Sequence, residues 1–179
     1  MRVVTAVEKY EPKPNDVTCF LAGGITNCPE WQKAVIEKLR RKVGVDNLVI
    51  FNPRRDNFPI GDPNASAEQI TWEFNQLEKM DIFSMYFSSG KSDQPICMYE
   101  LGRNIVNMQM RFPTDWEHRL VVTVESGYKR ENDVVIQTKL ATNHNLVSVV
   151  DDYEKSVDTH AIKIYRRFLE IEKRNRHGE

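Results

Sequence analysis

An acidic residue, Glu100, interrupts an apolar stretch that reads ICMYELGRNIV over residues 96–106. Tyr99 and Leu101 flank it, and apolar neighbours strip water from a carboxylate. If this stretch begins a helix, the free amide groups of the first turns favour the ionised form of the side chain. Such an anion can act as a nucleophile or stabilise a developing cation. An acid that only caps its own helix fits the same sequence.

A second acid, Glu73, lies on what the sequence predicts to be the buried face of the preceding helix. Ile70, Phe74, Leu77 and Met80 recur there at helical spacing. Glu73 stands three residues after Ile70 and four before Leu77, so it belongs to the same stripe. A charge on a buried face needs a reason, and burial makes a carboxyl group easier to protonate. We therefore predict an ionised Glu100 and a Glu73 that can hold a proton.

The spacing also predicts where Glu73 lies relative to the sheet. Glu73 precedes Asp81 by eight residues, and eight helical residues rise roughly 12 Å, close to the length of a short strand. A helix between two parallel strands runs antiparallel to them, so Glu73 should reach the same end of the sheet as Glu100. Asp81 then lies at the opposite end, where we predict a structural role in the turn from helix to strand.

Two carboxyl groups that face one crevice, one ionised and one protonated, suit reactions at a glycosidic bond. One group attacks or stabilises the anomeric carbon, and the other handles a proton on the leaving group. Gly23 and Gly24 form neither a P-loop nor a complete dinucleotide fingerprint; they allow a ligand to approach the backbone or simply make a turn. The histidines lack a nucleophile in a matching motif; they are His118, His144, His160 and His177.

The elements that must position these acids alternate along the chain. Five short apolar segments predict strands at residues 17–22, 47–51, 81–88, 119–124 and 146–150. Amphipathic segments predict helices at 31–42, 67–80, from about 96 onward, 132–142 and 156–175. Parallel strands need helical crossovers, so we predict an α/β fold with a five-stranded parallel sheet in a three-layer sandwich.

In such a sheet, ligands bind beyond the carboxyl ends of the strands, where the strand order reverses. The residues that follow the predicted strands are therefore the candidates for binding. They are Gly23, Gly24, Asn52, Arg54, the loop 88–95 with Glu100 behind it, and residues 125–127.

Length and charge set the broad class. The chain has 179 residues, 40% of them hydrophobic and 28% charged, with a formal net charge of −1. We predict an amino-terminal extension, residues 1–16, and a single domain over residues 17–179, separated by the linker-like EPKPND at 11–16. The charge favours neither a nucleic-acid partner nor an anionic membrane. Without a signal-like start or an apolar run of roughly 18 residues, we expect a cytoplasmic protein.

The cysteines give no sign of a metal site. Cys19, Cys28 and Cys97 are odd in number, lack CxxC spacing and have no histidine close by in sequence. Reduced thiols are the expectation, and we expect neither a metal nor a cofactor.

Four segments, taken in order, resemble the nucleoside 2-deoxyribosyltransferases and their relatives over roughly residues 17–135. The segments are FLAGGI at 20–25 with Trp31, FNPR at 51–54, WEFNQLEKMDI at 72–82, and YELG at 99–102. The resemblance implies a flavodoxin-like fold in which Glu100 attacks the anomeric carbon of a nucleoside. The base leaves, a glycosyl-enzyme ester forms, and a second base or water takes the sugar with retention. Glu73 stands where the family carries the acid that helps to protonate the leaving base.

The sequence departs from the family pattern at the sugar. Phe20 falls where classical members carry a tyrosine, and Gln94 beside Asp93 falls where they carry an aspartate six residues before the nucleophile. Asp93 and Gln94 join the substrate-binding candidates, but recognition of the sugar hydroxyls stays open. The family also borrows an asparagine from a neighbouring subunit, and Asn132 is the nearest match, which implies a homo-oligomer. An ordinary helix start explains Asn132 equally well.

Relatives with the same fold hydrolyse nucleoside monophosphates, using a serine, an arginine or a glycine-rich turn to bind the phosphate. The turn GGITN at 23–27 and the pair Arg54 and Arg55 could serve here, although such a pair is equally compatible with a solvated loop. Trp72 could stack on a base or belong to the core. Three functions remain open: deoxyribosyl transfer, hydrolysis of a nucleotide such as a 5′-monophosphate or NAD, and non-catalytic nucleotide sensing. Glu73 favours an enzyme, because a sensor could dispense with it.

Overall fold

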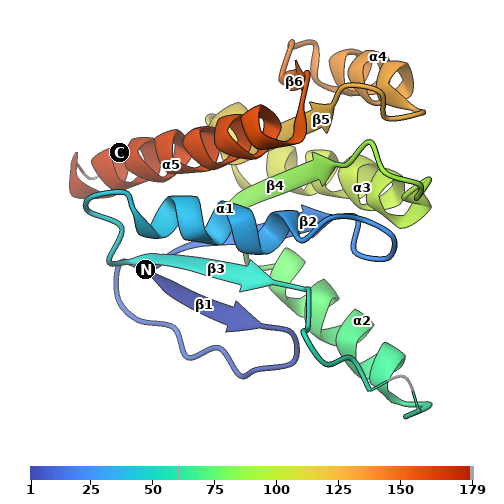
Figure 1. Ribbon diagram of the computed structural model, residues 1–179. Helices are drawn as coiled ribbons and strands as arrows, with labels where there is room; N and C mark the ends of the chain where they lie inside the picture. The colour runs from blue at the N-terminus through green and yellow to red at the C-terminus, as the bar shows by residue number, and fades with distance from the viewer. Residues whose placement is uncertain (60, 178–179) are drawn as a thin grey trace.

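The computed structural model describes residues 1–59 and 61–177 (Figure 1). The elements in chain order are β1 (Arg2–Thr5), β2 (Val17–Gly23), α1 (Trp31–Arg40), β3 (Leu48–Asn52), α2 (Ala65–Leu77), β4 (Ile82–Phe87), α3 (Pro95–Arg111), the 3-10 helix η1 (Trp116–Arg119), β5 (Leu120–Glu125), α4 (Glu131–Thr142), β6 (Val147–Val150) and α5 (Tyr153–His177).

All strands of the sheet run parallel, in the order β1-β3-β2-β4-β5-β6. The predicted α/β class and the flavodoxin-like three-layer arrangement are confirmed. The predicted strand count is wrong, because the described residues form six strands and not five. The additional strand is β1, in a segment that we expected to be an extension; it pairs with β3 from Arg2↔Val49 to Thr5↔Asn52. A four-residue edge strand carries too short a pattern to be recognised in sequence.

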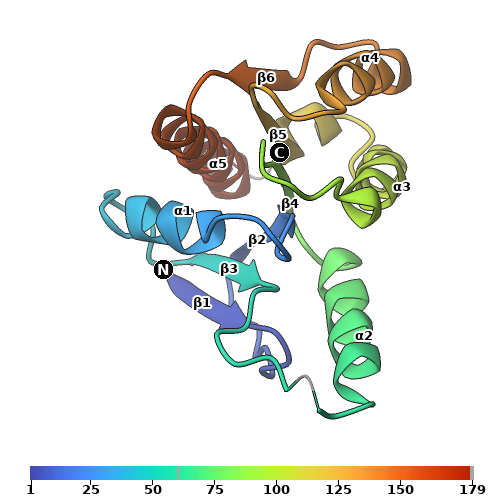
Figure 2. The same cartoon turned by 45° about the vertical axis from the view of Figure 1, so that its right-hand side comes forward.

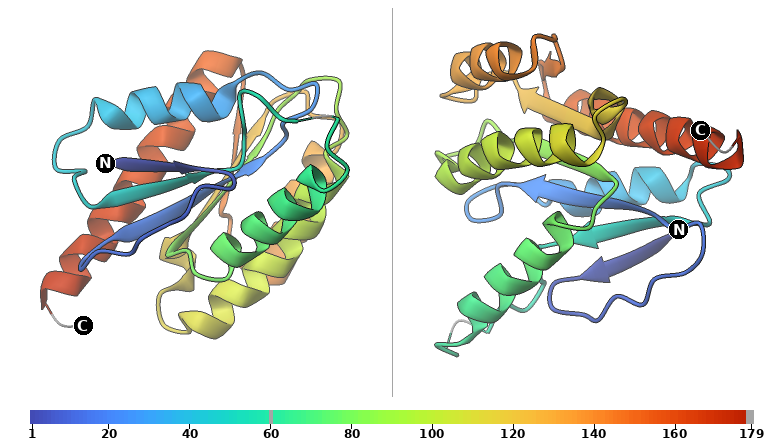
Figure 3. Two further views of the ribbon diagram at one scale, coloured as in Figure 1. Left: turned by 90° about the horizontal axis from the view of Figure 1, so that it is seen from below. Right: turned by 180° about the vertical axis from the view of Figure 1, so that it is seen from behind.

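Helices cover both faces of the sheet, as the left view of Figure 3 shows. On one face, α1 and α5 bury Trp31, Leu39 and Phe168 against strand residues such as Leu21 and Ile50. On the other face, α2, α3 and α4 pack on a second cluster, which includes Trp72, Leu101, Met108, Val134, Phe20 and Phe83. Full burial of a large apolar side chain contributes about 1.5–3 kcal/mol, so these two clusters hold the layers together.

A buried polar network fastens α5 to the middle of the sheet. Nε2 of His160 lies 2.6 Å from Oγ of Ser84 on β4, and its Nδ1 lies 2.9 Å from Oγ1 of Thr123 on β5. Burial lowers the pKa of His160 to about 3, and the charge of Lys163 adds to this effect. The imidazole is therefore neutral and serves as a structural hydrogen-bonding group.

Asp81 has the structural role that we predicted for it. Its Oδ2 accepts hydrogen bonds from the backbone N and from Oγ1 of Thr18, both at 2.8 Å, at the amino end of the sheet. The opposite end is the one where the order of strands reverses. The chain passes from β2 to β3 on one side and places β4 on the other side of β2, which opens a crevice at their carboxyl ends. Within the described residues, no helix is long and apolar enough to cross a membrane.

Candidate active site

Two adjoining cavities are both lined by Glu73, Ile96 and Glu100: one lies at the carboxyl end of β2, and the other lies between α2 and α3, two helices on the right-hand side of Figure 2. The smaller, of about 280 Å³, is here called the turn cavity; its other residues include Gly23, Gly24, Thr26, Ser92, Gln94 and Cys97. The larger, of about 490 Å³, is here called the helix groove; its other residues include Phe58, Gln69, Ile70, Phe74, Tyr99 and Arg103. The two acids therefore stand where the cavities meet.

Glu100 is the sixth residue of α3, which begins with Pro95. Burial and, to a smaller extent, the charge of Glu73 raise the pKa of Glu100 to about 7, while Arg103 opposes the shift. Our expectation of a fully ionised carboxylate is thus wrong. The influence of a helix amino terminus falls off within the first turn, and Glu100 lies in the second turn, so burial outweighs it.

Glu73 projects from α2 and is half-buried. Burial raises the pKa of Glu73, while a hydrogen bond of 2.9 Å from Nε2 of Gln69 to its Oε1 lowers it. Both acids thus favour the protonated form more than a free side chain does. Because ionisation of one opposes ionisation of the other, the two acids titrate as a coupled pair.

The helical stripe that led to Glu73 is only partly buried. Leu77 and Met80 lie in the core, but Ile70 is 64% exposed and Phe74 is 51% exposed, so the predicted buried face is wrong at these two positions of α2. Figure 1 shows the reason: the amino-terminal half of α2 extends beyond the carboxyl ends of the strands. Ile70 and Phe74 are left uncovered and form a wall of the helix groove instead.

Gln94 joins the loops that follow β2 and β4. Its Oε1 accepts hydrogen bonds from the backbone N of Gly24 at 3.2 Å and of Ser88 at 3.4 Å. Its Nε2 donates to the carbonyl oxygen of Ser88 at 2.8 Å and of Ser92 at 3.4 Å. Gln94 is buried, and its φ of 48° lies in the left-handed region, which costs roughly 1–2 kcal/mol for a residue with a Cβ. The four hydrogen bonds hold it in that conformation.

The glycine turn after β2 is packed against its neighbours. The indole Nε1 of Trp31 donates to the carbonyl oxygen of Gly24 at 2.9 Å. A Cβ atom at Gly24 would lie 2.4 Å from Sγ of Cys28 and 2.6 Å from Oε1 of Gln94, so a larger residue would displace these two side chains. A Cβ atom at Gly23 would lie 2.4 Å from the carbonyl oxygen of Tyr86. Both glycines make a tight turn and also line the turn cavity.

Arg54 binds the loop between β2 and α1. Its guanidinium donates to the carbonyl oxygens of Ile25 at 2.8 Å, Cys28 at 3.0 Å and Pro29 at 2.5 Å. Its backbone N donates to Oδ1 of Asn52 at 3.1 Å. Neither Arg54 nor Asn52 is among the described residues that line the two cavities. Arg54 therefore positions the loop.

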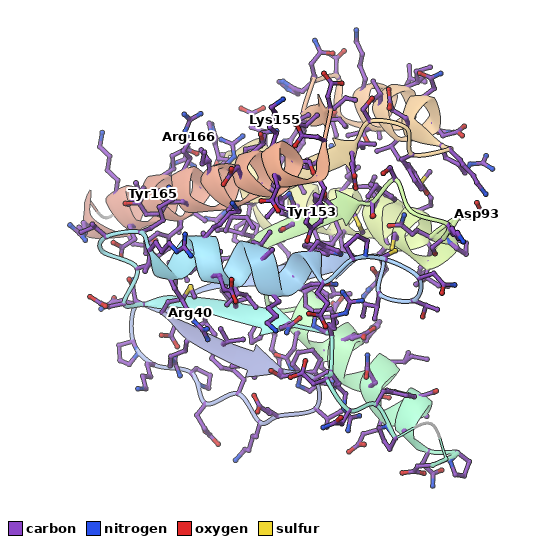
Figure 4. All side chains as sticks on the ribbon, in the orientation of Figure 1. Arg40, Asp93, Tyr153, Lys155, Tyr165 and Arg166 are labelled. Atoms are coloured by element: carbon purple, nitrogen blue, oxygen red, sulfur yellow. The ribbon has the colours of Figure 1, made fainter. Side chains whose placement is uncertain are left out.

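Three other candidates also lie outside both cavities as the structure describes them. Trp72 is in the core beside Phe20 and Phe51, and its Nε1 donates to the carbonyl oxygen of Glu8 at 2.8 Å. Asp93 lies at the outer surface, as Figure 4 shows, and pairs with Lys129 at 2.9 Å. Asn132 is exposed in the first turn of α4.

The structure thus brings together Glu73, Glu100, Gly23, Gly24 and Gln94. The sequence pattern did not predict the aromatic and aliphatic wall of the helix groove, which is formed by Phe58, Ile70, Phe74, Ile96 and Tyr99. A signal was present, because Ile96 and Tyr99 precede Glu100 within one helical turn, but they read as core residues. No group of three or more His, Cys, Asp or Glu side chains among the described residues could hold a metal ion.

Comparison with known proteins gives one family. A family model described as "Nucleoside 2-deoxyribosyltransferase like" matches residues 16–112, a span that includes β2 to α3 and both acids. No curated protein sequence matches the chain.

Proposed function

Because the chain belongs to the nucleoside 2-deoxyribosyltransferase-like family, we propose that it cleaves the N-glycosidic bond of a deoxynucleoside and transfers the 2-deoxyribosyl group to another base. The observation that carries this proposal is the pair of half-buried acids, Glu73 and Glu100, at the junction of two cavities. A glycosidic bond placed at this junction would lie beside both acids.

In the proposed reaction, ionised Glu100 attacks the anomeric carbon of the sugar while the bond to the base nitrogen breaks. The electron pair of that bond leaves with the base, and protonated Glu73 gives its proton to the base. An ester now joins the sugar to Glu100. A second base attacks the same carbon, Glu73 takes its proton, and Glu100 leaves as a carboxylate, so the configuration is retained.

The raised pKa values support this division of labour. Burial and mutual repulsion favour one shared proton, and one proton is what the first step needs. Binding of a sugar whose anomeric carbon becomes positively charged stabilises the ionised form of Glu100. The proton then resides on Glu73, where the leaving base takes it.

Hydrolysis of a nucleoside 5′-monophosphate, or of another nucleotide such as NAD, is the second candidate. One observation favours it: the turn cavity is lined by Thr26, Ser92 and the first residues of α3, Pro95 to Cys97. Hydroxyl groups and a helix amino terminus suit a phosphate. The engagement of Arg54 with its own loop weighs against it. A non-catalytic sensor is the third candidate, and the placement of Glu73 at the cavity junction weighs against that one.

An exchange assay separates the three candidates. The protein is incubated with a deoxynucleoside and a different free base, and the products are resolved by chromatography. Transfer gives the exchanged nucleoside, and the Glu100→Ala and Glu100→Gln variants abolish it. Release of free base alone, accelerated by a 5′-phosphate, supports the hydrolase. Binding without any turnover supports the sensor and refutes the proposed transfer.

We also propose that the protein works as a homo-oligomer in the cytoplasm. Asn132 is exposed and lies outside both cavities of its own chain, so it could complete the site of a neighbour only through assembly. Exposed apolar side chains on α3 and α4 offer a surface for a second copy: Val106, Met110, Ile136 and Leu140. The three cysteines are free, which suits a reducing compartment.

A further inference from the structure

The helix groove is larger and more apolar than a site for a plain base requires. Its walls include Ile70, Phe74, Ile96 and Tyr99, whose side chains are 64%, 51%, 66% and 68% exposed. A volume of about 490 Å³ falls within the roughly 300–1,000 Å³ of pockets that hold drug-sized ligands. Large apolar side chains that surround one concavity point to a ligand that buries them.

The two acids lie where the turn cavity meets the helix groove, so the sugar and the leaving group of a substrate can occupy different cavities. The turn cavity, with backbone turns and hydroxyl groups, offers a sugar the hydrogen-bonding partners that it needs. The helix groove begins at the same two acids and continues between α2 and α3. When the anomeric carbon lies at the junction and the sugar fills the turn cavity, the leaving base extends into the helix groove.

Two of the polar side chains in the helix groove are engaged within the chain through their donor groups. Nε2 of Gln69 donates to Glu73 and, at 3.0 Å, to the carbonyl oxygen of Pro53. Arg103 pairs with Glu78, and its guanidinium carbon lies 4.4 Å from the centroid of the Phe74 ring. Besides the two acids, Ser66 and the carbonyl oxygen of the Gln69 side chain, the groove therefore presents ring faces and a flat stacked cation.

We propose that the preferred leaving group is a nucleobase that carries a bulky apolar substituent, such as an aromatic ring on its exocyclic amine. The inference rests on the proposed function, because the acids fix which end of the groove receives the base. The ring of the base lies next to the acids, and the substituent packs between α2 and α3 on Phe74 and Tyr99. A plain base leaves most of the apolar wall in water.

Calorimetric titration tests the ligand class without any turnover. Free adenine and N6-benzyladenine, and cytosine and N4-benzylcytosine, are titrated into the full chain. We expect the benzyl compound of each pair to bind roughly tenfold to a hundredfold more tightly, because a phenyl group leaves water, with a more negative heat-capacity change. Equal affinity within both pairs overturns the proposal.

Two variants locate the bound substituent. Phe74→Ala shortens a half-exposed residue of the groove wall, so the variant should fold normally. We expect its affinity for the benzyl compound to fall about fivefold or more and its affinity for the plain base to change little. Leu169→Ala, at an exposed position of α5 on the other face of the sheet, is the matched control and should change neither affinity. If Phe74→Ala instead alters the sedimentation of the protein while the benzyl base fails to bind, a second copy occupies the groove and the proposal is refuted.

Turnover separates this inference from the proposed function. Deoxyadenosine and its N6-benzyl derivative are compared by kcat/KM in the exchange assay. A higher value for the benzyl substrate supports both proposals. Turnover of both substrates at equal kcat/KM, with equal binding of the free bases, keeps the proposed function and refutes the bulky leaving group. Selective binding of the benzyl base without cleavage of either nucleoside refutes the proposed function, while the ligand class stands.

Discussion

Glu73 and Glu100 do not titrate independently, because the charge of one carboxylate opposes ionisation of the other. Glu100 has a pKa raised to about 7 by burial and by the charge of Glu73, and the pKa of Glu73 is raised as well. In the proposed reaction, the site is active only while the pair of acids holds one proton. The pH dependence of the reaction therefore reports on the pair and not on either side chain alone.

We predict a bell-shaped profile of kcat/KM against pH, with the alkaline limb near pH 7, where the last proton leaves the pair. Glu73→Gln removes the negative charge beside Glu100, so the pKa of Glu100 falls. It also removes the proton donor, which lowers the rate by about 10²–10⁴. The residual activity should rise with pH as Glu100 ionises and then stay level. An alkaline limb that persists in Glu73→Gln would show that another group donates the proton.

Gln94 is a positioning residue, and its role requires a side chain that both donates and accepts hydrogen bonds. In Gln94→Glu, a carboxylate oxygen replaces the Nε2 group that donates to the carbonyl oxygens of Ser88 and Ser92. The carbonyl oxygens of Ser88 and Ser92 then lose their donor and face the buried negative charge of the new carboxylate. We expect the free energy of unfolding to fall by about 2–4 kcal/mol. Urea denaturation measures it. The neighbouring Asp93→Asn, at the exposed surface, is the control and should stay within about 0.5 kcal/mol of the parent. Equal stability of the two variants would contradict the role of Gln94.

At the scale of elements, α5 depends on a histidine that must stay neutral. The pKa of His160 is about 3 in the folded protein, mainly because of burial, against 6.5 for a free side chain. Between these values the unfolded chain binds a proton that the folded chain does not. Stability conferred by this group is thus fully present above about pH 6.5 and declines as the pH falls toward 3.

We therefore predict that His160→Gln, which keeps a polar side chain but cannot titrate, unfolds with a weaker dependence on pH below 6.5 than the parent. The parent should lose a few kcal/mol more than the variant between pH 6.5 and 4, as measured by thermal or urea unfolding at each pH. His118→Gln, at a half-buried surface position, is the matched control. Identical slopes in the parent and in His160→Gln would exclude His160 as the cause of acid destabilisation.

Local sequence patterns predicted five of the strands, the helices between them and the meeting of Glu73 with Glu100. They failed where the answer depends on distant contacts. Nothing near Arg54 in sequence reveals that its guanidinium binds carbonyl oxygens at residues 25–29. The stripe through Ile70 and Phe74 has the spacing of a buried face, yet both residues are exposed. Whether the sheet is long enough to cover α2 depends on other segments of the chain, and α2 extends beyond the strand ends (Figure 1). Periodicity shows which side chains share a face, and the neighbouring elements determine whether that face is covered.

At the scale of the whole molecule, the proposed oligomer makes a distinctive prediction. If Asn132 of one chain completes the site of its neighbour, then Glu100→Gln and Asn132→Ala damage different contributions to the same site. Each variant alone should be nearly inactive. In a mixed dimer, one site combines the intact Glu100 of one chain with the intact Asn132 of the other, while the second site carries both changes.

Mixing equal amounts of the two inactive variants under conditions that exchange subunits should therefore restore activity to about one quarter of the parent, since half of the dimers are mixed and each has one good site in two. The control is a mixture of Glu100→Gln with Glu73→Ala. Glu73 and Glu100 line the same cavities of one chain, so no mixed dimer of these variants contains an intact site. Recovery in the first mixture and none in the control would assign Asn132 to the partner. If Asn132→Ala alone is fully active, or if the first mixture stays inactive, each chain completes its own site and the exposed face of α3 and α4 has a different purpose.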